Sequence, residues 1–386
     1  MNAPIPMESR ELGERLKAAR SRAGLTQGRA ADRLGLARTT LVAIEKGQRP
    51  VKAEEIRSLT MLYGVSVNSL LRPSAVHVEL VPHFRSLKGA NDDAVADATR
   101  LLNDLAAAEV ELEQMLGKPL STAYPPERPI LAGEVKEQAE EAAMELRHRL
   151  GIGLAPVNDM ISLLELEIGI RVFVRPLGDG RISGLFAYHD QIGACILINK
   201  NHPRERRALT GAHELGHFVS NRRDPDVFIE DGKENSKEER FATAFGLAFL
   251  LPAILVRKRF DEFVTDEKHF SPRHLIFMAH ALHVSTEAIC RRLEDMKLLP
   301  RGKWESLKER GFSGEIERQA LGDQPQGEAS VFPPRILYLA AEAFGRGLVS
   351  EGQLAGMLRM NRVEIREMLD LLDSGKYDDA ESIPVK

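Results

Sequence analysis

Apolar residues recur at helical spacing along most of the chain, whereas the alternation typical of strands is confined to one short stretch. Helices are expected at 11–20, 26–35, 38–47, 91–117, 134–150, 156–166, 208–219, 238–251, 272–281, 287–298, 336–345 and 353–369. Strands are expected at 170–175, 182–188 and 194–198, separated by turns that contain glycine. The predicted fold class is therefore mainly α with a small β-sheet, an α+β architecture.

The first three helical patterns have the lengths and turns of a helix-turn-helix module. Packing of the second helix on the third would use the apolar residues Ala30, Ala31, Leu34, Leu41 and Ile44. The outward face of the third helix would then meet the major groove of DNA through Arg38, Thr39 and Ala43. Phosphate contacts, which position the module without reading sequence, are expected from Gln27, Thr40 and Arg49.

Charge supports this interpretation independently of the helical pattern. Residues 1–72 hold thirteen Lys or Arg and seven Asp or Glu, a net charge of +6, so the remainder carries −10 of the total of −4. Positive charge gathered in one small module attracts phosphate before any base is read. The alternative is a helical protein-interaction module whose basic face is only solvated.

Short motifs in this region are similar to the XRE family of bacterial repressors. They are Thr26-Gln27 at the start of the second helix, Ile44-Glu45-Lys46-Gly47 at the end of the third, and the Arg49-Pro50 that follows. The resemblance spans about residues 9–72 and implies a five-helix module that continues through 52–63 and 67–71. Such modules usually bind operator DNA with two-fold symmetry, so we expect a homodimer.

The most informative chemical motif is His213-Glu214-Leu215-Gly216-His217. Residues four apart on a helix lie on the same face, so His213 and His217 can offer imidazole nitrogens to one Zn²⁺ while Glu214 reaches the metal-bound water. Apolar neighbours would bury this helix and bring the imidazoles into a cleft, which disfavours a surface helix with solvated histidines. The pattern predicts a zinc hydrolase site.

A catalytic zinc usually has three protein ligands, and the segment 238–252 is where the third is expected. Ser236 is placed to cap this helix, with Glu239 three residues later, and Pro252 interrupts the helical pattern. Such a helix could lie against the histidine helix. Spacing alone does not select the ligand within it.

The two segments together resemble the ImmA/IrrE family of zinc-dependent bacterial peptidases, over about residues 134–295. The motifs are Ala212-His-Glu-Leu-Gly-His217, then Glu239-x-x-Ala242-x-x-Phe245 and Leu250-Leu251-Pro252. The resemblance implies a zincin-like fold in which Glu239 is the third zinc ligand, with Glu238 as a competitor that would only favour the helix N-terminus. Family members often carry Glu-Ala-Asn where this chain has Phe241-Ala242-Thr243.

These motifs imply a reaction and a class of substrate. Zinc would lower the pKa of its water, and Glu214 would act as the general base and then return the proton to the leaving amine. An edge strand of the small sheet would bind an extended protein substrate by backbone pairing, although the sequence does not say which strand is the edge.

The remaining features set the organisation of the chain. No apolar run has the length of a membrane span or the form of a secretory signal, so we expect a cytoplasmic protein without a membrane partner. Cys195 and Cys290 are expected to be core thiols. The histidines at 274, 280 and 283 are expected to be exposed rather than a second metal site. The expected domains are 1–72, the DNA-binding module; 73–129, a helical arm and Pro-rich linker; 130–300, the peptidase domain; and 301–386, a mobile segment and helical C-terminal region.

Three classes of function remain open at this stage. The first is a bacterial transcriptional regulator whose peptidase domain cleaves a regulatory protein. The second is a transcription factor whose peptidase fold only senses a metal, a ligand or a partner. The third is an antitoxin-like autoregulator. The intact set of His213, Glu214, His217 and Glu239 favours the first, because a sensor or binder does not need the general base.

Overall fold

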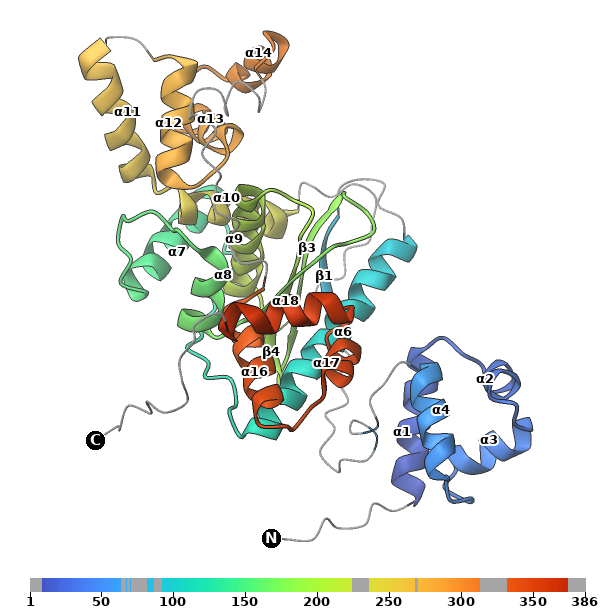
Figure 1. Ribbon diagram of the computed structural model, residues 1–386. Helices are drawn as coiled ribbons and strands as arrows, with labels where there is room; N and C mark the ends of the chain where they lie inside the picture. Colours follow the sequence, from blue (N-terminus) through green and yellow to red (C-terminus); the bar gives the residue numbers. More distant parts are fainter. Residues whose placement is uncertain are drawn as a thin grey trace. The chain divides into compact units, whose positions relative to one another are not determined.

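The computed structural model describes residues 9–63, 67, 70, 82–86, 92–223, 236–267, 270–312 and 332–373. The protein is mainly helical with one small sheet, as the sequence predicts (Figure 1). It divides into two compact units, each built from separate stretches of the chain. One comprises 1–78, 104–119 and 337–386, and the other comprises 79–103 and 120–336.

In the described part of the N-terminal module the helices are α1 (Ser9–Arg22), α2 (Gln27–Leu34), α3 (Arg38–Glu45) and α4 (Ala53–Tyr63). Thr26 caps α2 through its side chain, and Gly35 ends it in the left-handed conformation with a φ of 64°. The predicted packing of α2 on α3 is confirmed, because both helices supply residues to one apolar core: Leu16, Ala19, Ala30, Ala31, Leu41, Ile44 and Leu59. Of the fifth helix expected at 67–71, only Val67 and Leu70 are described, and both are helical.

A buried ion pair connects two helices of this module. The Arg20 guanidinium on α1 donates to both carboxylate oxygens of Glu45 at the end of α3, at 2.6 and 3.2 Å. The Gln27 side-chain amide donates to the same carboxylate at 2.8 Å. Only 9% of the Arg20 side chain and 2% of the Glu45 side chain are exposed. Because water hardly reaches either group, each charge is stabilised mainly by the other.

Within the described residues the sheet has four strands in the order β1-β3-β4-β2. The strands β2 (Arg171–Arg175), β3 (Ile182–His189) and β4 (Gly193–Asn199) are the three that the sequence predicts. The fourth, β1 (Pro82–Ser86), was not predicted and pairs antiparallel with β3. β3 and β4 are also antiparallel, whereas β2 and β4 are parallel. Among these described strands, β1 and β2 are the edge strands.

Three helices form the layer that carries the candidate site: α7 (Val135–Arg149), α9 (Arg204–Ser220) and α10 (Lys237–Leu250). α9 packs on β3 and β4, and α10 packs on both α9 and α7. All of them contribute to one apolar core with the sheet. The helix expected at 156–166 is instead a short α8 (Met160–Ser162) that continues as a π-helix, η1 (Leu163–Ile168), and ends at Gly169.

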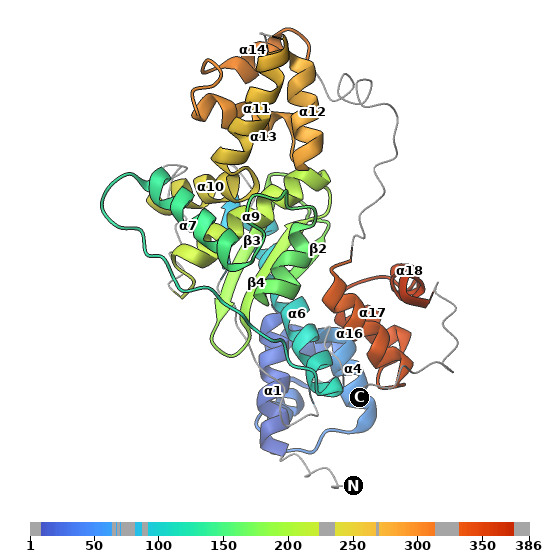
Figure 2. The same cartoon turned by 90° about the vertical axis from the view of Figure 1, so that its left-hand side faces the viewer.

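Four further helices extend this core: α11 (Ala253–Glu267), α12 (Pro272–Leu282), α13 (Thr286–Asp295) and α14 (Lys303–Glu309), seen together at the top of Figure 2. The expectation of three exposed histidines is wrong for His274, which is 7% exposed and whose Nδ1 accepts from the backbone N–H of Ser271 in a capping box. His280 and His283 are exposed as expected.

The remaining helices are α6 (Asp92–Leu116), α16 (Pro334–Gly345), α17 (Glu351–Met357) and α18 (Arg362–Asp373). The helix α6, expected as an arm, is deeply buried along its second half, where Leu105 is 2% exposed and Leu112 is fully buried. Ion pairs fasten this end to the C-terminal helices, with Lys118 Nζ 3.4 Å from Glu342 Oε1 and Arg359 Nη2 2.9 Å from Asp104 Oδ2. The segment 313–331, within the stretch expected to be mobile, lies outside the described residues.

The Pro-rich segment expected as a linker has no regular secondary structure, yet it is fastened to β4 and α9. The Tyr124 hydroxyl accepts from the Ala194 N–H at 2.9 Å, and the Tyr124 ring meets Phe218 edge to face. Burial raises the pKa of Tyr124 to about 12. Arg222 pairs with Glu127 at 3.1 Å. These contacts tie the segment to the end of α9.

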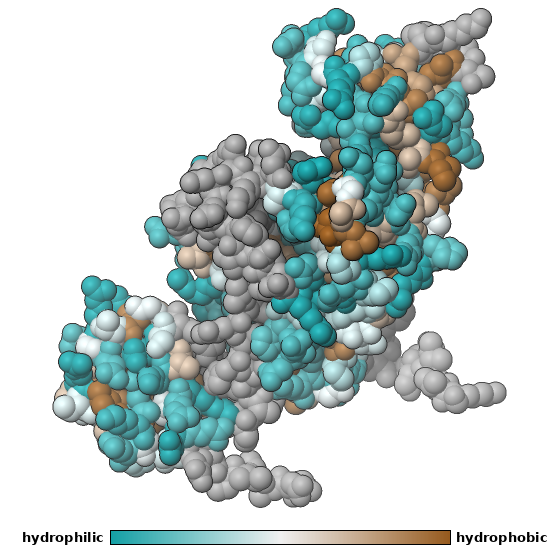
Figure 3. All heavy atoms as spheres, turned by 180° about the vertical axis from the view of Figure 1, so that it is seen from behind, coloured by the Kyte–Doolittle hydropathy of each residue, from teal (hydrophilic) through white to brown (hydrophobic). Residues whose placement is uncertain are grey.

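The exposed apolar side chains are dispersed over several helices and the loop before α7. They include Met61, Leu131, Leu166, Ile254 and Val363. Figure 3 shows one face of the protein, on which hydrophobic residues gather only in small areas within a largely hydrophilic surface. Among the described helices none is long and apolar enough by itself to cross a membrane. The helix α10 and residues Ala253–Val264 of α11 satisfy those criteria only together, with a bend of 53° between them.

Candidate metal centre

The helix α9 holds the His-Glu-x-x-His motif in the interior of the protein. Most of its residues from Thr210 to Ser220 are buried against the sheet and α10. Side-chain exposure is 1% for His213 and 12% for His217, and Glu214 is 1% exposed. The two imidazoles stand one turn apart and edge to face, with ring centroids 4.8 Å apart. The motif is thus presented by a rigid, packed helix.

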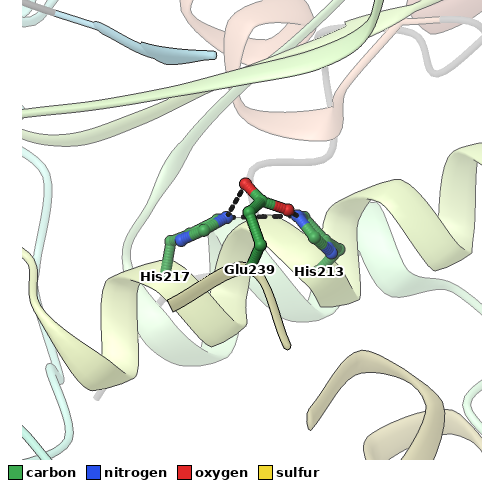
Figure 4. Close-up of side chains that lie close together, drawn as sticks. All are labelled: His213, His217 and Glu239. Atoms are coloured by element: carbon green, nitrogen blue, oxygen red, sulfur yellow. Dashed lines mark hydrogen bonds and ion pairs between the residues drawn. The ribbon is translucent and has the colours of Figure 1, made fainter. Parts of the chain in front are cut away.

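The third side chain comes from the first turn of α10. Ser236 caps this helix as predicted, because its hydroxyl accepts from the Glu239 N–H at 3.1 Å. The Glu239 carboxylate then reaches both histidines, with oxygens 3.4 Å from His213 Nε2 and 3.2 Å from His217 Nε2. Figure 4 shows the three side chains pointing toward one another.

The spacing of these atoms suits a tetrahedral metal ion. Four ligands at about 2.0–2.2 Å from zinc stand about 3.3–3.6 Å from one another. The two Nε2 atoms are 3.1 Å apart, and the carboxylate oxygens lie 3.2 and 3.4 Å from them. Among the described residues His213, His217 and Glu239 are the one group able to hold a metal. Two neutral nitrogens and one carboxylate are a donor set that zinc accepts.

Electrostatics at the cluster favour an ionised carboxylate. Burial of Glu239 disfavours the charged form, but hydrogen bonds and charge from His213 and His217 outweigh it and hold its pKa well below the usual range. Glu238, the competing acid, belongs to a different environment, with its carboxylate 3.8 Å from Lys237 Nζ. The geometry therefore groups Glu239, and not Glu238, with the two histidines.

Two glycines allow the helices to approach closely enough for this cluster to form. A β-carbon on Gly216 of α9 would stand 2.8 Å from the Cα of Ala242 on α10. A β-carbon on Gly246 of α10 would stand 3.0 Å from the backbone nitrogen of His213. A side chain at either glycine would push the helices apart. The local sequence pattern does not reveal this role, although Gly216 lies inside the motif.

Glu214 lies between α9 and the sheet. A β-carbon on Gly184 of β3 would stand 3.2 Å from Glu214 Oε1 and 2.5 Å from Thr210 Cγ2. The absence of a side chain at Gly184 leaves the space that the carboxylate occupies. Gly184 therefore shapes the surroundings of the candidate general base, a role that the strand pattern alone did not reveal.

The residues expected to contact DNA lie on the N-terminal module in two situations. Arg38 and Thr39 are exposed at the start of α3, and Thr40 and Ala43 are partly exposed on the same helix. The other two have partners within the protein: Gln27 donates to Glu45, and Arg49 donates to both oxygens of Glu55, at 2.8 and 3.1 Å. Hydrogen bonds from Arg49 and the Lys52 N–H hold the pKa of Glu55 below its ordinary value.

Comparison with known protein families gives one match in the N-terminal module and one in the region that holds the candidate metal centre. Residues 11–71 match the model of a helix-turn-helix domain family, and residues 166–294 match the peptidase M78 family, described as an IrrE N-terminal-like domain. No match was found among curated proteins. A solved chain described as ComR from Streptococcus suis is 12% identical, with 96% of this chain and 95% of that chain covered, at a TM-score of 0.17. That score is too low to support an argument about fold.

Proposed function

We propose that this chain, in which a helix-turn-helix domain is joined to a domain of the ImmA/IrrE peptidase family, is a zinc-dependent peptidase that acts on a regulatory protein and binds operator DNA as a homodimer. The convergence of His213, His217 and Glu239 on one point carries the proposal. Glu214 follows the first of these ligands directly in the chain and is 1% exposed. A metal sensor would need the ligands but not this acid.

The residues of the chain have distinct roles in the proposed reaction. A bound zinc ion supplies a Lewis acid that polarises a peptide carbonyl and acidifies water. The Nε2 atoms of the two histidines and the Glu239 carboxylate hold the ion. Glu214 accepts a proton from the attacking water as general base and delivers it to the nitrogen of the leaving amine. Its buried position between α9 and β3 restricts the carboxylate to few orientations.

The DNA-binding role rests on the N-terminal module. The exposed start of α3 carries Arg38 and Thr39, and such a helix fits the major groove of DNA. Residues 1–72 have a net charge of +6, which attracts phosphate without sequence preference. Binding to chromosomal operators implies that the protein acts in the cytoplasm. Replacing Arg38 with Ala is expected to weaken binding to the operator more than binding to unrelated DNA.

The experiment that tests the peptidase compares wild type with Glu214→Gln. Elemental analysis of both purified proteins is expected to find one zinc per chain. Proteomics of cells that express either protein should reveal a target that accumulates with the Gln variant. The purified target is then incubated with each protein, and only wild type is expected to cleave it. The matched control is Glu238→Gln, which removes a neighbouring carboxylate and is expected to keep both zinc and cleavage.

The possible contrary outcomes point to different conclusions. Cleavage by the Glu214→Gln protein would overturn the role of that residue. A wild-type protein without zinc would overturn the hydrolase and leave a DNA-binding regulator. Bound zinc without any accumulating target would favour the sensor. A monomer in light scattering at working concentration would contradict the homodimer.

A further inference from the structure

The histidine ligands face the candidate metal site with a defined pair of nitrogens. His213 and His217 approach each other through Nε2, and the Glu239 carboxylate lies against the same two atoms. A neutral imidazole carries one proton, so a ring that offers Nε2 to a metal holds its hydrogen on Nδ1. His213 is almost fully buried, and a buried N–H needs an acceptor. The acceptor decides which tautomer the ring adopts.

Thr243 supplies an oxygen at the required place. Its Oγ1 lies 3.4 Å from His213 Nδ1, on the side of the ring away from the cluster of Nε2 atoms. The distance is at the long end for a hydrogen bond, as is common before a ligand tightens a site. Thr243 stands four residues after Glu239, so both project from the same face of α10. The helix α10 thus offers the Glu239 carboxylate to the metal and the Thr243 hydroxyl to His213.

The close approach of the two helices allows a short side chain to make this contact. Gly246, three residues after Thr243, lies against the backbone of His213, where a β-carbon would stand 3.0 Å from the nitrogen. At this separation the short side chain of a threonine is long enough to reach the His213 ring. The hydroxyl of Thr243 therefore provides an oxygen acceptor within reach of the ring.

Exposure distinguishes the two partners of this contact. The His213 side chain is 1% exposed, whereas Thr243 is exposed to solvent. The threonine therefore covers Nδ1 on its outer side. A valine would keep this cover and remove the acceptor. An alanine would leave room for a water molecule that can accept the same hydrogen.

We infer that Thr243 is a positioning residue for the zinc site, whose hydroxyl accepts the Nδ1 hydrogen of His213 and so keeps Nε2 available to the metal. The inference rests on the proposed zinc site, but it does not depend on peptidase activity. Partners of this kind set the orientation and tautomer of a ligating histidine, and their loss costs about 10- to 100-fold in metal affinity.

The test measures zinc affinity in the full-length protein by competition with a chromophoric chelator. The variants are Thr243→Ser, Thr243→Ala and Thr243→Val. Serine keeps the acceptor and is expected to stay within about twofold of wild type, valine is expected to bind zinc about tenfold more weakly or worse, and alanine should fall between them. The matched control is Thr99→Val, which removes a helical hydroxyl that bonds the Val95 carbonyl far from the site along the chain.

The order of the variants separates positioning from packing. A packing role predicts that alanine, which removes volume, is worse than valine. Zinc affinity of the valine variant within twofold of wild type, or a weaker affinity for alanine than for valine, would overturn the inference. Nitrogen-15 spectra of the zinc-loaded protein give a second readout, in which the Nδ1 hydrogen of His213 is expected to be hydrogen-bonded in wild type and in the serine variant, and to lose this bond in the valine variant. A wild type that binds no zinc would instead overturn the proposed function and this inference with it.

Discussion

Gly216 and Ala242 face each other where α9 crosses α10, so closely that a β-carbon on the glycine would stand 2.8 Å from the alanine Cα. Real β-carbons essentially never come this near to another atom, and the contact is with backbone, which cannot turn aside. The separation of the two helices is therefore set at this crossing. Since the ligands come from both helices, the crossing also sets the size of the metal cluster.

Gly216→Ala is expected to weaken zinc binding without changing any ligand. The added methyl group would force the backbone of α10 to shift and carry Glu239 with it. Overpacking of this kind costs about 1–3 kcal/mol of stability. Zinc titration of the folded variant measures the effect, with Gly28→Ala as control, because a β-carbon there meets no atom within 4 Å. Unchanged zinc affinity would show that the helices can part without disturbing the ligands.

Gly184→Ala is expected to damage catalysis more than metal binding. A β-carbon at this position would lie 3.2 Å from Glu214 Oε1 and 2.5 Å from Thr210 Cγ2, so the carboxylate must shift. A misplaced general base loses about 10²-fold in rate or more. Cleavage of the identified target and zinc content are measured on the same preparation. Equal losses of zinc and of cleavage would argue against an effect confined to Glu214.

Zinc is expected to stabilise the peptidase region against heat. A ligand present at about 1,000 times its dissociation constant adds about 4 kcal/mol to the folded state. Removal of metal with a chelator should therefore lower the midpoint of thermal unfolding, and added zinc should restore it. The Glu239→Gln variant is expected to lose most of this response. His280→Gln, which changes an exposed histidine on α12, should respond as wild type does.

Glu45→Gln is expected to destabilise the DNA-binding module by about 3 kcal/mol, because it leaves the buried Arg20 guanidinium without its counter-charge. Hydrogen exchange of the backbone amides of α1 to α3 in the full-length protein reports this loss locally. Glu14→Gln is the control, since its pair with Arg10 is exposed on both sides, at 67% and 81%, and such pairs contribute little. Equal hydrogen exchange in both variants would mean that the buried ion pair does not contribute to the stability of the module.

Cys290 is expected to resist alkylation in the folded protein up to strongly alkaline pH. Burial, with a smaller effect of Glu294, raises the pKa of this thiol to about 12, whereas the cysteine of an unfolded chain ionises near its ordinary pKa of 9.0. Below about pH 9 both states keep the proton, and this group does not weaken the fold. As pH rises from there toward 12, only the unfolded state ionises, so stability falls. Mass spectrometry of iodoacetamide-treated protein and unfolding at increasing pH test this, with Cys290→Ala expected to lessen the alkaline loss.

Local patterns in the sequence predicted most of the elements and the metal cluster. The period of apolar residues located β2 to β4 and most of the helices, but it missed α11 and α14 and joined α17 and α18 into one helix. The spacing of His213 and His217 and the capped start of α10 located the candidate ligands. Such signals are local and need no knowledge of packing. The family resemblance was needed to select Glu239 over Glu238.

Features that depend on distant contacts were not predictable in the same way. The strand β1 is five residues long and begins with proline, so its own pattern is weak and its pairing with β3 decides its conformation. The fastening of the Pro-rich segment depends on Tyr124 meeting β4 and α9, and no local rule reveals it. The contact between Thr243 and His213 likewise exists only because two helices cross at glycines.

The strand β1 has a consequence for how the chain can be divided. It lies between the DNA-binding match, which ends at residue 71, and the peptidase match, which begins at residue 166, yet it completes the sheet at the flank of β3. A truncation at the Pro-rich segment would therefore uncover the backbone donors and acceptors of β3 along one side. Bare strands of this kind recruit other chains and aggregate. The region that matches the peptidase family therefore needs β1 to complete its sheet. Shortened versions of the protein should begin before residue 82.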